Sequence, residues 1–180
     1  METFTSPDKQ YIINMYMKQK DYNFSEYDKY NVFMDINDVS GINKVSITTN
    51  ELEFVRFLNE LSIFIDEFYG MINSSHFVPF DFTFHPNIYN QKINISCNFN
   101  FPNNLIGSSD IESPEDDYME EYLCMSVNRV FNDRYMENVI HMTMDTSYIE
   151  ELIMCGWNTI QDVPDVESLI YSELLESLNC

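Results

Sequence analysis

The segment Lys92–Phe101 reads KINISCNFNF and alternates polar and apolar side chains without a break. In an extended chain its Ile, Cys and Phe positions all project to one side, and its Lys, Asn and Ser positions to the other. One buried face and one hydrated face are typical of an antiparallel sheet. The nearby segment Phe80–Phe84 (FDFTF) alternates in the same way, with a turn expected around residues 85–87. We therefore predict two strands, over 80–84 and 92–101.

A second pair of strands is expected earlier in the chain. Apolar and polar residues alternate over Lys29–Ile36, the turn-forming segment Asn37–Gly41 follows, and Lys44–Thr48 resumes the alternation. This order predicts a hairpin with a longish loop. The preceding segment Gln10–Lys20 is amphipathic in a way that fits either a helix or a strand, and we expect a short helix there.

The clearest helical signal lies between these two pairs of strands. Thr49 or Asn50 can cap a helix, Glu53 stands three residues after Asn50 as in a capping box, and Gly70 is a suitable end. Apolar side chains recur at helical spacing at Leu52, Val55, Leu58, Leu61, Ile65 and Phe68. Further apolar residues on other faces, Phe54 and Phe57 among them, indicate a central helix packed against a sheet.

The remainder of the chain is expected to be mainly helical. Residues 102–114 read as a loop that separates it from the preceding part. The expected elements are a helix over Glu115–Phe131, a strand over Asn138–Met144, a helix from Thr146 or Ser147 to Cys155, and a final helix over Asp165–Leu178. Gly156 is expected to end the third of these, and Trp157 to belong to the core.

These patterns predict an α+β protein with an antiparallel sheet of about four or five strands packed on a central helix, followed by a mainly helical C-terminal part. We divide the chain into an α+β body (1–101), a loop (102–114) and an acidic C-terminal part (115–180). One continuous domain is the alternative, and no internal repeat is evident in the sequence.

The chain is more acidic than the codon usage suggested by its composition would predict. The chain has no alanine but 20 Asn, 18 Ile, 12 Tyr and 14 Phe, as an AT-rich coding sequence would give, and such a sequence should also be rich in lysine. It has 9 Lys and Arg against 30 Asp and Glu, a net charge of −21. A charge of this size repels nucleic acid and anionic membranes and attracts cationic surfaces. We therefore expect a basic protein as partner.

The charge is not evenly spread along the chain. No Lys or Arg follows Arg134. The candidate partner-binding residues are Asp110, Glu112, Glu115, Asp116, Asp117, Glu120, Glu121, Glu150, Glu151, Asp162, Asp165 and Glu167. Two plainer explanations are open: Glu115 and Asp116 would be stabilised at a helix N-terminus, and acidity by itself increases solubility.

No catalytic or metal-binding motif is present. His76, His85 and His141 do not have the spacing of metal ligands, and no phosphate-binding glycine loop or nucleophile motif occurs. The four cysteines are widely spaced, which favours reduced thiols and a cytoplasmic location. The N-terminal ten residues lack the apolar core of a secretory signal, and no stretch is apolar enough to span a membrane. No enzymatic activity and no cofactor is expected.

The acidity favours a small inhibitor, encoded by a phage or mobile element, that imitates the charge of DNA and blocks the basic cleft of a nucleic-acid-processing enzyme. A CRISPR effector, a restriction enzyme or a repair nuclease would present such a cleft. Two alternatives share the same electrostatics. One is an immunity protein that neutralises a basic toxin, and the other is a viral structural or assembly protein.

Overall fold

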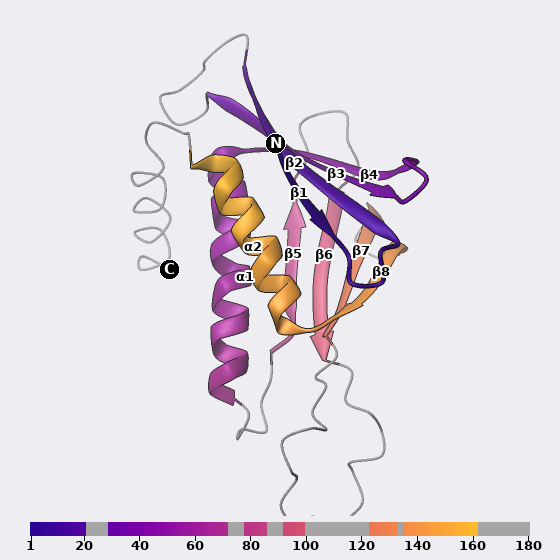
Figure 1. Ribbon diagram of the computed structural model, residues 1–180, viewed down its shortest axis with the longest axis vertical. Helices are drawn as coiled ribbons and strands as arrows, with labels where there is room; N and C mark the ends of the chain where they lie inside the picture. The colour runs from indigo at the N-terminus through magenta and orange to yellow at the C-terminus, as the bar shows by residue number, and fades with distance from the viewer. Residues whose placement is uncertain (21–28, 72–77, 86–91, 100–122, 133–134, 162–180) are drawn as a thin grey trace, which may run out of the picture.

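The computed structural model describes residues 1–20, 29–71, 78–85, 92–99, 123–132 and 135–161 (Figure 1). The elements are β1 (Glu2–Thr5), β2 (Tyr11–Gln19), β3 (Tyr30–Asp38), β4 (Asn43–Asn50), α1 (Glu51–Met71), β5 (Phe80–Phe84), β6 (Lys92–Phe99), β7 (Leu123–Asn132), β8 (Tyr135–Met144) and α2 (Thr146–Ile160). The predicted helix over 165–178 and the predicted loop over 102–114 lie outside the described residues.

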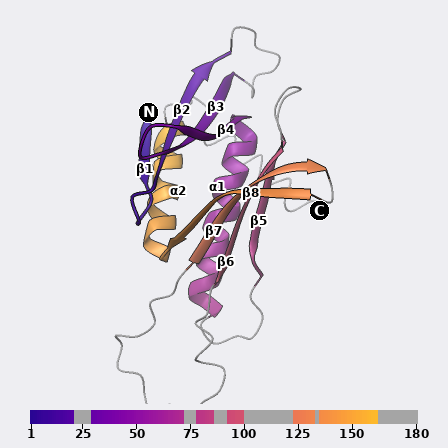
Figure 2. The same ribbon diagram turned by 90° about the vertical axis from the view of Figure 1, so that its right-hand side faces the viewer.

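The strands form two antiparallel sheets of four, in the orders β1-β2-β3-β4 and β5-β6-β7-β8. Helix α1 contacts both sheets, through β3, β4 and β5, and α2 lies against α1, β1 and β2 (Figures 1 and 2). The predicted α+β class is confirmed. So are the hairpin now seen as β3 and β4, strands β5 and β6, helix α1 and the strand within β8.

The second half of the chain repeats the element order of the first, four strands in a meander followed by a helix. The last hairpin of each half buries three cross-strand pairs and has a register shift directly after the third. The pairs are Val32–Thr49, Met34–Ile47 and Ile36–Val45 in one half, and Leu123–Met144, Met125–Met142 and Val127–Ile140 in the other. The shared register lets many paired positions of one half be matched with positions of the other, although the side chains differ too much for the sequence to show a repeat.

A polar side chain caps the helix that follows each hairpin. The Glu53 N–H donates to Asn50 Oδ1 at 2.8 Å, so Asn50, one of the two predicted caps, is the residue that caps α1. The Tyr148 N–H donates to Asp145 Oδ1 at 3.2 Å, so the cap of α2 is Asp145 and not Thr146 or Ser147. Both residues satisfy a backbone donor that has no partner within its helix.

Two predicted helices are wrong. Tyr11–Gln19 is the strand β2, in which Ile13 and Met15 are buried while Ile12, Asn14 and Tyr16 lie on the outward face. The pattern resembled a helix because Ile12 and Tyr16 make the outer face apolar as well. The predicted helix over 115–131 is a strand from Leu123 onward, since β7 pairs with β6 and β8 and buries alternate residues. Residues 115–122 lie outside the described part of the chain.

Helix α2 also continues past the glycine at which it was predicted to stop. Gly156 is buried in the middle of the contact with α1, where a Cβ atom would lie 2.4 Å from Leu58 Cδ2. This glycine permits close helix approach and does not end the helix, which runs to Ile160. Trp157 is partly buried and packs against the core.

The β3–β4 turn is organised by Asp38. Its Oδ1 accepts hydrogen bonds from the Ser40 N–H and Oγ and from the Ile42 N–H, and its Oδ2 lies 2.9 Å from Lys44 Nζ. These contacts, led by the Ser40 side chain, hold the pKa of Asp38 well below its usual range. A lowered pKa means that the ionised carboxylate stabilises the turn at neutral pH, and that this contribution falls as the pH drops below the unfolded-state value of about 3.9.

We expect Asp38→Ala to accelerate hydrogen exchange at the Ser40 and Ile42 amides by about tenfold, because each amide loses its acceptor. Exchange measured by NMR on the variant and on Asp66→Asn, an exposed acid of α1, provides the check. Unchanged exchange at both amides of the Asp38 variant would show that the carboxylate does not organise the turn.

Candidate interaction surface

Of the twelve predicted partner-binding residues, the structure describes two. Glu150 and Glu151 are exposed in the first half of α2, a helix without a single Lys or Arg. Met154, one turn further along, is 62% exposed. The other ten, namely Asp110, Glu112, Glu115, Asp116, Asp117, Glu120, Glu121, Asp162, Asp165 and Glu167, lie outside the described residues.

The described residues are much less acidic than the chain as a whole. They contain 8 of the 9 Lys and Arg residues but 14 of the 30 Asp and Glu residues, which gives them a net charge of −6. The remaining −15 of the −21 therefore belongs to the other segments, chiefly 100–122 and 162–180. The excess of acidic residues therefore lies in particular segments of the chain. Acidity that served only to keep the protein in solution would not need to be concentrated in this way.

The anchor points of the acidic segment 100–122 lie beside the start of α2. The segment connects β6 to β7, and Phe99 and Leu123 at its two ends are cross-strand partners. Leu123 also pairs with Met144, the residue before the cap of α2. The structure thus places the start of the helix that carries Glu150 and Glu151 at the same end of the second sheet as these anchors, while the helix itself packs on α1, β1 and β2 (Figure 1).

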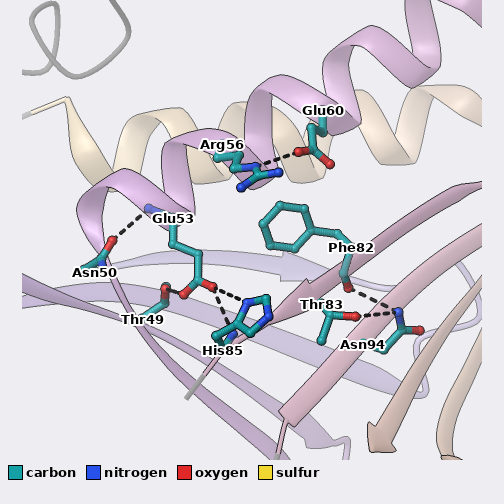
Figure 3. A network of polar contacts seen from close by, with 9 residues as sticks. All are labelled: Thr49, Asn50, Glu53, Arg56, Glu60, Phe82, Thr83, His85 and Asn94. Carbon is teal, nitrogen blue, oxygen red and sulfur yellow. Dashed lines mark hydrogen bonds and ion pairs between the residues drawn. The ribbon is translucent and has the colours of Figure 1, made fainter. Parts of the chain in front are cut away.

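The Glu53 carboxylate connects the two halves of the molecule at the start of α1 (Figure 3). Glu53 accepts a hydrogen bond from the Thr49 hydroxyl, and its Oε1 lies 2.9 Å from the His85 backbone nitrogen and 3.3 Å from His85 Nδ1. The carboxylate therefore joins the end of β4 to the end of β5. Glu53 supports the architecture here and does not close a capping box onto Asn50.

The outward face of the second sheet is polar and largely uncharged. Asn94 donates to Asp81 and to Thr83, Asn128 donates to Asn94, and Asn138 donates to Asn128, so a ladder of hydrogen bonds crosses all four strands. Figure 3 shows the hydrogen bond from Asn94 to Thr83 in this ladder. Because these groups satisfy one another, the ladder stabilises strand pairing.

A serine and a histidine meet on the same face, with Ser126 Oγ 3.1 Å from His141 Nδ1. A hydrolytic site would also need a group that orients the histidine and an environment that excludes water. Here the pair is exposed, and no described carboxylate contacts His141. The geometry does not support nucleophilic catalysis.

The described residues contain no group of three metal-ligating side chains. The three described cysteines, Cys97, Cys124 and Cys155, are free thiols. Burial raises the pKa of Cys97 far above its usual value, so this thiol stays protonated and is unreactive at neutral pH.

The outward face of the first sheet carries a feature that the sequence analysis missed. The rings of Tyr16 on β2 and Phe33 on β3 are stacked, with centroids 5.0 Å apart and planes 7° apart. Lys18 Nζ lies 5.3 Å from both ring centroids, and the Tyr16 hydroxyl donates to Asp35 Oδ2 at 2.9 Å. Desolvation, with the contribution of Asp35, raises the pKa of Tyr16. Reading YIINMYMKQ as a strand would have placed Tyr16 on the outward face, but its partner Phe33 follows only from the register between β2 and β3.

Comparison with known proteins does not assign the chain to a family. No protein-family model matches it, and no curated protein matches its sequence. Neither of the two described helices is long and apolar enough to cross a membrane.

Proposed function

We propose that the protein is a non-enzymatic inhibitor that binds the basic, nucleic-acid-binding surface of another protein and excludes the nucleic acid from it. The observation that carries this proposal is the segregation of charge. A folded body of net −6 is joined to segments that together carry −15 and contain a single basic residue, Arg134.

The physical basis is competition for the same cationic groups. A protein that grips DNA does so with Lys and Arg side chains placed against a dense line of phosphate charge. A chain that presents a comparable density of carboxylates can neutralise those side chains in place of the phosphates. Long-range attraction would also accelerate the encounter at low ionic strength.

The described geometry supports this proposal in one respect. The anchors of segment 100–122, at Phe99 and Leu123, share one end of the second sheet with the start of the helix that carries Glu150 and Glu151. Two sets of candidate residues are therefore attached to the same region of the body, where one partner surface could contact both.

The proposal predicts capture of a nucleic-acid-binding protein from a lysate of the natural host at about 50 mM salt. Release is expected at about 300 mM, where the Debye length is only about 6 Å. The captured protein, identified by mass spectrometry, should also be displaced by added duplex DNA or RNA. Capture that persists at the higher salt and ignores the competitor would contradict the proposal. Capture of one small basic toxin would instead support the immunity alternative.

A further inference from the structure

The repeated register of the two sheets provides an internal comparison for Tyr16 and Phe33. These two residues are cross-strand partners on β2 and β3, and the corresponding partners on β6 and β7 are Asn98 and Cys124. The same strand pairing is thus built with small side chains in the second sheet. The fold does not require aromatic rings at these outward positions, which leaves their presence in the first sheet to be explained by another role.

The ring pair already attracts a cation within the protein. Lys18 Nζ stands at the same distance, 5.3 Å, from the centroid of each ring. Both rings are partly exposed, as is Asp35, whose Oδ2 accepts the Tyr16 hydroxyl. An aromatic face beside a carboxylate is the environment in which an arginine side chain can stack and form a hydrogen bond at once.

We infer that the Tyr16–Phe33 pair, together with Asp35, is an anchor site for an arginine side chain of the basic partner, and that Lys18 occupies this site in the free protein. This inference rests on the proposed function, because it assumes a partner rich in Lys and Arg. It adds a defined contact to an interaction otherwise described only by charge. Buried Tyr and Arg contacts are also common among the residues that dominate binding energy at interfaces.

A nucleobase is the other group that stacks on exposed aromatic rings. Such a ligand brings phosphates, and the net charge of −21 opposes the approach of any polyanion. Arginine is favoured for this reason. Removing the Lys18 charge should also affect the two ligands in opposite ways, because the ammonium group competes with a cation for the site but attracts a phosphate.

The first test uses a short blocked peptide that carries two arginines, and the same peptide with neutral citrulline in their place. NMR titration should shift the ring resonances of Tyr16 and Phe33 with the arginine peptide only. Tyr16→Asn with Phe33→Ser, close to the residues of the second sheet, should weaken binding about two- to fivefold. Ring signals that do not respond to the arginine peptide would overturn the inference.

The sign of the Lys18 effect gives a second, independent readout. Lys18→Gln should tighten binding of the arginine peptide about twofold more than Lys9→Gln, which removes the same charge from an exposed turn residue. Equal effects of the two substitutions would show that Lys18 does not occupy the site. An oligothymidine that shifts the ring signals, and that binds more weakly to the Lys18 variant, would show that the site takes nucleobases and would also contradict the inference.

The ring variants separate this inference from the proposed function. Against a captured partner, Tyr16→Asn with Phe33→Ser should lower the affinity about tenfold. If neutralising the acidic segment abolishes capture while the ring variant binds normally, the anchor site is wrong and the proposed function stands. If no basic protein is captured but the rings bind the arginine peptide, the proposed function is wrong and the arginine-binding property of the ring pair stands.

Discussion

Replacing Phe57 by alanine is expected to lower the free energy of unfolding by about 3–5 kcal/mol, the typical effect of removing a large buried aromatic side chain. Phe57 is fully buried on α1, and its ring lies 5.0–6.0 Å, centroid to centroid, from the rings of Phe80, Phe82 and Phe84. It therefore connects the helix to every apolar position of β5. Truncation would leave a cavity between the two halves of the molecule.

The matched control for this prediction is Phe33→Ala. Phe33 is also stacked on an aromatic ring, but it faces outward and is only partly buried, so its truncation should cost about 0.5–1.5 kcal/mol. Chemical denaturation of the two variants measures both values. Equal losses, or a loss below about 1.5 kcal/mol at Phe57, would contradict the placement of the core between α1 and β5.

Replacing Gly156 by leucine is expected to destabilise the protein by about 1–3 kcal/mol, because the contact between α1 and α2 has no room for a side chain there. A Cβ atom at this position would already lie 2.4 Å from Leu58 Cδ2, and Leu58 is fully buried. The better helix propensity of leucine, worth up to about 1 kcal/mol over glycine, offsets part of this cost.

A double-mutant cycle identifies the cause of that loss. Leu58→Ala alone should cost about 2–5 kcal/mol by leaving a cavity, but the new side chain at position 156 can occupy the vacated volume. The double variant should therefore be more stable than the sum of the two losses predicts, by about 0.5–3 kcal/mol. Additive losses, measured by denaturant unfolding, would mean that the two positions are not in contact.

Sequence periodicity predicted the elements in which one face is buried and the other is hydrated. Strands β5 and β6, the β3–β4 hairpin and helix α1 belong to this group, since their apolar residues recur at the spacing of the element. The prediction was wrong where both faces are apolar, as in β2, and where the apolar residues fit a helical as well as a strand spacing, as in β7. At Gly156 a local rule for helix ends was overridden by packing against Leu58, which lies almost one hundred residues away in the chain.

Some surface features could likewise be predicted from the sequence, and others required the structure. Charge is a property of composition, so the sequence alone located the acidic segments, and the structure added the positions of Glu150 and Glu151 on α2. The Tyr16–Phe33 pair depends on the register of two strands separated along the chain. The pair became visible only with the pairing of β2 and β3. The proposal that it binds a partner depends on comparison with the corresponding pair in the second sheet.

The measurement that tests the central claim most directly is the affinity for a captured partner after five acids of segment 100–122 are neutralised. The variant combines Glu115→Gln, Asp116→Asn, Asp117→Asn, Glu120→Gln and Glu121→Gln. A control of equal charge change neutralises Glu2, Glu60, Asp66, Glu67 and Glu137 on the described body. We predict a loss of at least about tenfold for the first variant and less than about threefold for the control. Equal losses would mean that only net charge matters, and an unchanged affinity of the first variant would contradict the claim that this acidic segment contacts the partner.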